Sequence, residues 1–159
     1  MADDANEQAA RFVEKHSPPV VDAWQKWSEA FALAKKTNRR VWVRISQRYC
    51  GPCFQLNNGL DDHRTMLEKE FVLLKIDDVR DKNGVEVATV ITGGKPYGVP
   101  FFAFYDADQN MLIDSHGPTG NIGSISGYEG KRHFRKMLQK VKQTLSDEEI
   151  ERIVGSVED

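Results

Sequence analysis

The chain has 159 residues, of which 40% are hydrophobic, and it carries a formal net charge of −2. This length and hydrophobic content suit one compact domain with a genuine core, so a scaffold that depends on disulfides is not required. Acids and bases are interspersed without a stripe of Lys, Arg and aromatic residues, which argues against nucleic acid as a partner. We expect a flexible segment over residues 1–16 and a single domain over residues 17–159.

The sequence contains no apolar run long enough to cross a membrane, so we expect a soluble chain. It begins Met-Ala-Asp-Asp, which is acidic and polar and unlike a signal peptide. The protein is expected to be cytoplasmic if this N-terminus is native. It is expected to be exported, to the periplasm or another extracytoplasmic space, if a signal peptide has been removed. The compartment therefore stays open.

The first predicted element is a helix that begins after Ser17, a candidate N-cap, with Pro18 at the first helical position. The pattern ends at Thr37 and Asn38. Apolar residues recur along this segment at helical spacing: Val20, Ala23, Trp24, Trp27, Ala30, Phe31 and Ala34. The stripe predicts one buried face, and large aromatic residues on such a face belong to a core more often than to a ligand site.

Next come a strand, a helix and a second strand. Residues 41–46 (VWVRIS) and 71–77 (FVLLKID) are short and mostly apolar, as strands buried on both faces are. Residues 54–70 predict a helix that is interrupted at Gly59 and restarts at the pair of aspartates two residues later. A strand, crossover helix and strand normally form a right-handed parallel unit, which we expect in the middle of a sheet.

The second half of the chain is less regular. Residues 78–99 contain charges, glycines and a proline, and we expect an insertion and loop, in which residues 85–91 suit a short helix or an irregular strand. Residues 101–107 and 111–116 flank a turn-rich stretch and predict an antiparallel hairpin. The glycine-rich residues 117–130 are expected to form a surface loop.

Two further helices are expected near the C-terminal end. The first has an apolar stripe that should cover the sheet: Phe134, Met137, Leu138, Val141 and Leu145. The second begins at Ser146, which has capping-box spacing to Glu149, and ends near Val154. The sequence shows no internal repeat and no second domain.

Both cysteines lie in residues 48–54 (RYCGPCF), directly after the first predicted strand. A cysteine where a strand gives way to a helix faces unpaired backbone N–H groups and the positive end of the helix dipole, which lower its pKa. Cys50 is therefore the candidate nucleophile. Cys53 lies one helical turn further on, where it can form a small-ring disulfide and resolve an intermediate bound to Cys50. Gly51 and Pro52 flank the site, and Pro52 costs little in a first helical turn.

These motifs resemble the thioredoxin superfamily. Residues 49–53 (YCGPC) follow a predicted strand, residues 98–100 (GVP) precede another, and the alanine-rich segment EAFALAK lies before the first strand. The likeness extends over roughly residues 20–145. It implies an α/β thioredoxin fold, with a central mixed β-sheet flanked by helices and extra helices at the N- and C-terminal ends.

The resemblance also implies an activity. In that family, Cys50 would attack a substrate disulfide and Cys53 would resolve the mixed disulfide. Pro100 would be cis, and Val99 before it would pair through its backbone with an extended substrate segment. The implied partners are protein or peptide disulfides and dithiols and an unidentified redox partner, with no cofactor, no metal and no membrane span. The protein would act as a monomer.

Three positions depart from ordinary thioredoxins. Tyr49, which flanks the cysteines, stands where a tryptophan is usual, Phe54 stands where many members carry a basic residue, and Arg44 stands where a buried acid is usual. If Arg44 is directed at the cysteines, its charge stabilises the thiolate and makes the couple more oxidising. Alternatively, Arg44 pairs with an acid such as Asp77 or extends to solvent.

Other interpretations use the same two cysteines. A structural disulfide is disfavoured, because so small a loop gives little entropic stabilisation. A zinc site needs further ligands, and the four histidines lack paired spacing: His16, His63, His116 and His133. Metal handling by a thioredoxin fold and a redox-inactive module that binds peptides at Val99 and Pro100 both stay open.

Overall fold

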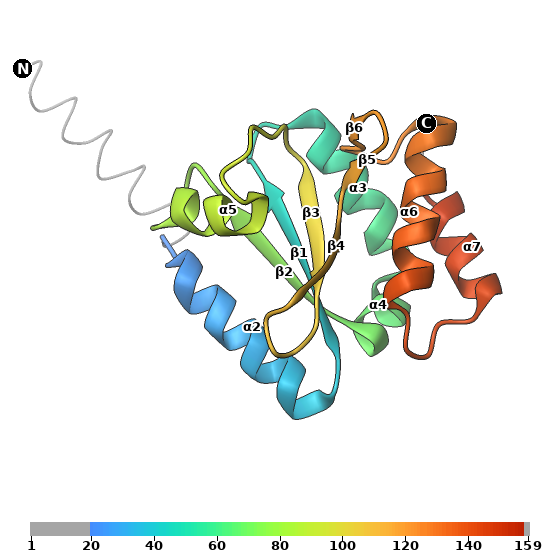
Figure 1. The fold of residues 1–159 in the computed structure, drawn as a ribbon, viewed down its shortest axis with the longest axis horizontal. Helices are drawn as coiled ribbons and strands as arrows, with labels where there is room; N and C mark the ends of the chain where they lie inside the picture. The colour runs from blue at the N-terminus through green and yellow to red at the C-terminus, as the bar shows by residue number, and fades with distance from the viewer. Residues whose placement is uncertain (1–19, 158–159) are drawn as a thin grey trace, which may run out of the picture.

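The computed structural model describes residues 20–157, and its centre is a four-stranded mixed sheet (Figure 1). The strands lie in the order β2-β1-β3-β4. Their bounds are Arg40–Ser46 for β1, Phe71–Asp77 for β2, Phe101–Tyr105 for β3 and Met111–Asp114 for β4. The predicted flexible segment over residues 1–16 lies outside the described residues.

The strand pairing agrees with the sequence patterns except at one edge. β1 runs parallel to β2, and β3 pairs antiparallel with both β1 and β4, so the predicted parallel pair and hairpin are confirmed. The expectation that this parallel unit lies in the middle of the sheet is wrong for β2, which forms an edge. After β2 the chain crosses to the far side of β1. As a result, β1 has a parallel neighbour, β2, on one side and an antiparallel neighbour, β3, on the other.

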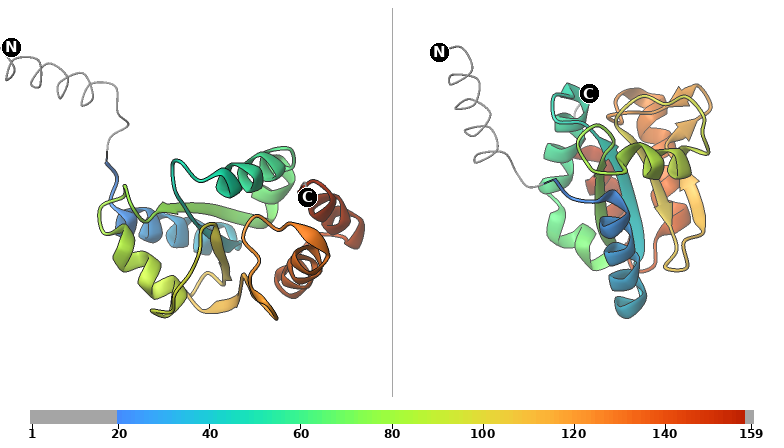
Figure 2. Two further views of the ribbon diagram at one scale, coloured as in Figure 1. Left: turned by 90° about the horizontal axis from the view of Figure 1, so that it is seen from above. Right: turned by 90° about the vertical axis from the view of Figure 1, so that its left-hand side faces the viewer.

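Helices cover both faces of the sheet. Helices α2 (Ala23–Thr37) and α5 (Gly84–Thr92) pack on one face, and their apolar side chains share one core cluster with alternate residues of the strands. Figure 1 shows them to the left of the sheet, and the left view of Figure 2 shows α3 and α5 on opposite sides of it. Because successive residues of a strand point to opposite faces, Val43 joins this cluster and Trp42 joins the other.

Four helices form the opposite layer. They are α3 (Gly51–Asp61), α4 (Arg64–Glu70), α6 (Gly127–Val141) and α7 (Asp147–Gly155). Trp42 of β1 is fully buried between the sheet and these helices. Phenylalanine rings surround it: Phe71, Phe102, Phe104 and Phe134. The predicted α/β fold is confirmed, with α2 before the first strand and α7 after the helix that covers the sheet.

The first described helix begins later than the sequence suggests. α2 starts at Ala23, and its cap is Asp22, whose side chain accepts a 2.8 Å hydrogen bond from the Trp24 N–H. The predicted cap Ser17 lies outside the described residues, and Val20 precedes the helix and is exposed. Residue 22 forms a parallel bridge with Lys82, which holds this part of the chain extended until Ala23.

The helix after the cysteines breaks at a different residue from the one predicted. α3 continues through Gly59 and ends at Asp61, and α4 begins after His63. Gly59 is buried because α3 touches the end of α7 there, and a Cβ atom on it would lie 3.1 Å from the backbone oxygen of Ser156. This glycine therefore permits close helix packing and does not interrupt the helix.

Residues 78–99 are not only an insertion and loop. Helix α5 occupies their middle and buries Val87, Ala88 and Ile91 against α2 and the sheet. Gly84 starts the helix close to the end of β2, where an added Cβ atom would lie 2.5 Å from the oxygen of Asp77. Gly84, which in the sequence is more typical of a loop, thus allows the start of α5 to lie against the end of β2.

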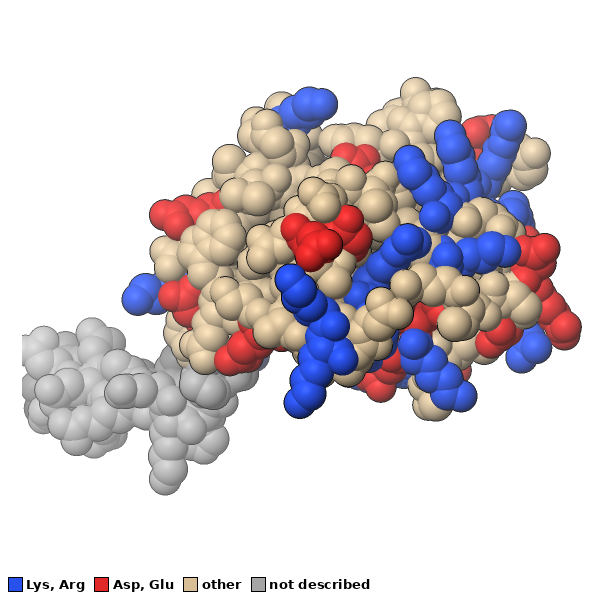
Figure 3. All heavy atoms as spheres, turned by 60° about the horizontal axis from the view of Figure 1, so that its bottom comes forward, with Lys and Arg blue, Asp and Glu red and all other residues tan. Residues whose placement is uncertain are grey.

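Residues 117–130 also contain more than a surface loop. Strands β5 (His116–Gly117) and β6 (Gly120–Asn121) form a small antiparallel hairpin, and Ile125 is fully buried. The predicted capping box of Ser146 with Glu149 is present at the start of α7. No helix among residues 20–157 is long and apolar enough to cross a membrane. Figure 3 shows side chains of both charges over one face of the molecule.

Candidate active site

The cysteine pair lies after the end of β1, at the start of α3. Cys50 has an extended backbone and is the N-cap of α3, and its Sγ atom accepts a 3.2 Å hydrogen bond from the Cys53 N–H. Gly51 and Pro52 form the first helical turn, where the missing N–H of proline leaves no intrahelical bond unmade. The Sγ atom of Cys50 therefore occupies the position at which a helix N-terminus stabilises negative charge.

The two cysteines are joined as a disulfide, with their Cα atoms 5.2 Å apart. They differ in exposure, because Cys50 is half-buried and Cys53 is only 2% exposed. A partner in solution can thus reach the first sulfur, whereas the second is shielded behind it. Tyr49 beside them is 90% exposed, and the guanidinium of Arg48 lies 5.5 Å from the centre of its ring.

A second segment, 49 residues later in the chain, meets the cysteines. The Val99–Pro100 peptide bond is cis, and the carbonyl oxygen of Val99 lies 3.7 Å from the Cys50 Sγ atom. Val99 is half-buried and Pro100 is buried at the start of β3. The geometry places the sequence-derived candidates Cys50, Cys53, Val99 and Pro100 at one end of the sheet.

Asp78 braces the two segments that carry these residues. Its carboxylate accepts a 2.9 Å hydrogen bond from the Gln47 side chain, before the cysteines, and another from the hydroxyl of Tyr97, before the cis bond. Burial and the hydrogen bond to Asp78 raise the pKa of Tyr97, so its hydroxyl stays a donor at physiological pH. Asp78 was not singled out from the sequence. Its position just beyond β2 could have identified it. β1 and β2 are parallel and end at the same edge of the sheet, so a residue after β2 is expected near the cysteines after β1.

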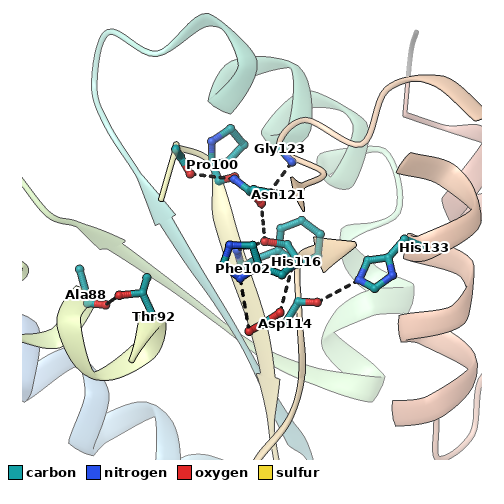
Figure 4. A network of polar contacts seen from close by, with 11 residues as sticks. Ala88, Thr92, Pro100, Phe102, Asp114, His116, Asn121, Gly123 and His133 are labelled. Carbon is teal, nitrogen blue, oxygen red and sulfur yellow. Dashed lines mark hydrogen bonds and ion pairs between the residues drawn. The ribbon is translucent and has the colours of Figure 1, made fainter. Parts of the chain in front are cut away.

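Asn121, in β6, contacts the same loop from the other side (Figure 4). Its side-chain amide donates hydrogen bonds to the carbonyl oxygens of Gly98, at 2.8 Å, and Pro100, at 3.0 Å. These two carbonyl groups flank Val99. Nothing in the glycine-rich sequence around Asn121 identifies this contact.

The comparisons with known proteins show the family of this chain. A family model described as thioredoxin-like matches residues 22–107, more than half of the chain. The chain belongs to the thioredoxin-like family. The match includes the cysteine pair and the cis-proline loop and ends before β4, so Asn121 and the last two helices lie outside it.

Two solved structures are similar to this chain, and the first has the same fold. A disulphide isomerase from Xylella fastidiosa Temecula1 is 18% identical, with 89% of this chain and 95% of that chain covered and a TM-score of 0.56. Thioredoxin O2 from Arabidopsis thaliana is also 18% identical, with 77% and 94% covered and a TM-score of 0.49. A comparison with curated protein sequences gives no significant match.

Arg44 of this thioredoxin-like chain lies beneath α3 and is largely buried. Its Nη1 atom donates a 2.5 Å hydrogen bond to the Asn57 side chain, one turn beyond Cys53, while its Nε atom is buried and has no hydrogen-bond partner among the residues that the structure describes. Burial lowers the pKa of Arg44 to about 10, so the guanidinium is charged at neutral pH. Among residues 20–157, Arg44 forms no ion pair with Asp77, and it does not extend to solvent.

A cavity of about 310 Å³ adjoins the thioredoxin-like site on the side of Cys53. Phe54 lines it and is 56% exposed, so this residue forms an apolar rim. Three basic residues also line the cavity: Arg48, Lys75 and Arg80. Asp77 is the acid on its wall, and its carboxylate accepts hydrogen bonds from the backbone N–H groups of residues 79 and 80. No group of three or more His, Cys, Asp or Glu residues placed to hold a metal ion occurs in the described part of the chain.

Proposed function

We propose that this protein is a thiol–disulfide oxidoreductase that exchanges disulfides with protein or peptide substrates through Cys50 and Cys53. The observation that carries the proposal is the position of the Cys50 Sγ atom, at the N-cap of α3 and 3.7 Å from the Val99 carbonyl oxygen. A thiolate is stabilised at a helix N-terminus, and the neighbouring extended backbone offers a docking strand. A substrate segment paired with Val99 would thus lie beside the Cys50 sulfur.

In the first step the Cys50 thiolate attacks one sulfur of a substrate disulfide. A bond forms between Cys50 and that sulfur, the substrate disulfide breaks, and the other substrate sulfur leaves as a thiolate that takes a proton from water. Cys50 is suited to this role because it is the more accessible cysteine. Tyr49, Gly51 and Pro52 are exposed around it and would form the contact surface for the substrate.

In the second step the Cys53 thiol gives its proton to water, and its thiolate attacks the Cys50 sulfur. The Cys50–Cys53 disulfide forms, the bond between Cys50 and the substrate breaks, and the second substrate thiolate leaves. The substrate gains two electrons and the protein loses two. The shielded position of Cys53 favours attack on a sulfur already bound to Cys50. Run in reverse, the same steps oxidise a substrate dithiol.

Val99 is proposed to hold the substrate during both steps. An extended segment can pair with its backbone beside Cys50, as a strand adds to a sheet edge, with the cis Pro100 behind it. Such pairing recognises the peptide backbone, so it suits protein and peptide disulfides in preference to small disulfides. We propose that one monomer suffices, because both cysteines and the docking loop lie in one chain.

Arg44 is proposed to raise the reduction potential of the Cys50–Cys53 couple. A buried positive charge beneath α3, hydrogen-bonded one turn beyond Cys53, favours the thiolate and hence the reduced form. The couple should then be more oxidising than that of ordinary thioredoxin, for which the reduction potential is about −270 mV.

The decisive test combines turnover with trapping. The reduced protein should reduce a peptide disulfide, Cys50→Ser should abolish the reaction, and Cys53→Ser should accumulate a mixed disulfide visible by mass spectrometry. Equilibration with graded glutathione mixtures should give a reversible two-electron transition. If the thiols stay inert, the redox-inactive binding module takes the place of this proposal. If they instead retain a metal ion through purification, the metal-handling module does.

A further inference from the structure

Asn121 uses all the hydrogen-bonding capacity of its side chain. The Nδ2 atom donates to the Gly98 and Pro100 carbonyl oxygens, and the Oδ1 atom accepts from the Ser115 hydroxyl at 2.6 Å and from the Gly123 N–H at 3.3 Å (Figure 4). An amide group has two donors and two acceptor sites, so this side chain is saturated. The four partners fix which end of the amide faces the loop.

The acceptor side of the amide is anchored in the sheet. Ser115 is fully buried, its hydroxyl accepts a 3.1 Å hydrogen bond from the Phe102 N–H, and its own N–H donates to the Phe102 carbonyl oxygen at 2.8 Å. Phe102 belongs to β3, the strand that begins directly after the cis-proline loop. The chain of contacts therefore runs from a rigid strand, through Ser115 and Asn121, back to the loop.

The two donated bonds flank Val99 and leave it free. Gly98 and Pro100 are held by their carbonyl oxygens, whereas no hydrogen bond within residues 20–157 uses the Val99 N–H. The Val99 carbonyl oxygen faces Cys50. The loop thus presents one residue, with an N–H that is unpaired in the described part of the chain and a carbonyl oxygen that faces Cys50, between two residues whose carbonyl groups are fixed.

We propose that Asn121 is a positioning residue that pre-orders the Val99 backbone for pairing with an extended substrate, and so selects substrates that have a peptide backbone. The inference deepens the proposed function and rests on it. Asn121 does not touch the reacting sulfurs, and its effect passes through Gly98 and Pro100. A docking strand that is already ordered loses less conformational entropy when the substrate binds. The β5–β6 hairpin is then part of the recognition machinery.

The test is Asn121→Asp, compared on two substrates. The aspartate keeps both accepted hydrogen bonds but, as a carboxylate, cannot donate to Gly98 and Pro100. With an extended peptide disulfide, kcat/KM should fall roughly tenfold, mainly through a higher KM. With bis(2-hydroxyethyl) disulfide, which has no peptide backbone, kcat/KM should change less than about twofold, and the reduction potential should stay unchanged. Equal loss on both substrates, or no loss on the peptide, would overturn the proposal.

Asn110→Asp is the matched control. It makes the same chemical change in the β3–β4 turn, where it removes a side-chain hydrogen bond to Asp106 at the far end of β3. Its kinetics should match the wild type on both substrates. Melting curves of both variants show whether either has unfolded, and Asn121→Ala provides a second replacement without a new charge. A peptide-specific loss in Asn110→Asp would contradict the proposal.

A second readout separates this inference from the proposed function. If the wild-type protein turns over neither substrate, the proposed function fails, and nuclear magnetic resonance still tests the positioning role. The backbone order parameters of Gly98 and Val99 should lie near 0.85 in the wild type and fall toward about 0.6 in Asn121→Ala. Unchanged order parameters would show that Asn121 does not order the loop.

Discussion

Glu70 and Thr144 form a hydrogen-bonded cap between two segments that are 74 residues apart. The carboxylate of Glu70, at the end of α4, accepts from the Thr144 N–H at 2.9 and 3.1 Å and from its hydroxyl, and it also accepts from the Gln143 N–H. Burial works against the charged form, yet these hydrogen bonds hold the pKa of Glu70 below its ordinary value. A buried carboxylate thus fixes the connection between α6 and α7.

Glu70→Gln should lower the free energy of unfolding by about 1–3 kcal/mol at pH 7, because an amide cannot accept at both positions. The folded pKa is lowered, so the stabilisation is complete above the unfolded pKa of about 4.3 and is lost as pH falls through the folded value. Urea titrations at pH 7 and pH 3 should therefore show a smaller difference between variant and wild type in acid. The exposed Glu68→Gln is the control, and an equal effect there would refute the prediction.

Arg44→Leu should make the Cys50–Cys53 couple more reducing. Removing the buried charge withdraws stabilisation from the thiolate, and a fall of roughly 15–30 mV corresponds to about 0.7–1.4 kcal/mol. Glutathione equilibration followed by alkylation measures it. Lys35→Leu, a change at an exposed cation near the end of α2, should leave the potential within a few millivolts, whereas an unchanged or higher potential in Arg44→Leu would argue against a role for Arg44.

Asp78→Ala should slow exchange with a peptide disulfide by roughly five- to tenfold, because small displacements of a docking segment are costly. The variant frees Gln47 and Tyr97, so the cysteine segment and the cis-proline loop lose their shared partner. Stopped-flow measurement of the first exchange step tests this directly. Asp108→Ala, which removes an exposed acid from the β3–β4 turn, should react at the wild-type rate. A wild-type rate in Asp78→Ala would show that the brace is dispensable.

Gly84→Ala should destabilise the fold by about 1–3 kcal/mol, since the new methyl group would overlap the backbone of Asp77 and Asp78. Gly51→Ala adds the same methyl group at the start of α3, where no atom lies within 4 Å, and should change stability by less than about 0.5 kcal/mol. Thermal melting compares the two. Similar melting temperatures for both variants would contradict the close approach of α5 to the end of β2.

The features that were predictable from the sequence depend on local order along the chain. The position of Cys50 at a helix N-terminus follows from a strand, a turn and a cysteine in succession, and the hairpin of β3 and β4 follows from two apolar runs around a turn. Contacts between distant segments leave no such local pattern. Asp78 and Asn121 both act on the Val99 loop, and each looks like an ordinary polar residue in its own stretch of sequence.

Other errors have equally specific causes. The sequence leaves residues 85–91 open between a short helix and an irregular strand within an expected loop, because Gly84 and the glycines after Thr92 resemble loop residues. The structure has a helix there, α5, and Gly84 permits its close backbone approach to the end of β2. The start of α2 was placed too early because Ser17 and Pro18 match a helix start, whereas the bridge between Asp22 and Lys82 keeps the chain extended. In each case tertiary packing overrode a valid local preference.

The contact between Gly59 and Ser156 has a consequence for the order in which the molecule is completed during synthesis. The ribosome synthesises α3 about a hundred residues before the last turn of α7, so the face of α3 that carries Gly59 first forms without this neighbour. A nascent chain arrested before α7 should therefore show weaker hydrogen-exchange protection around Gly59 than the chain that includes α7.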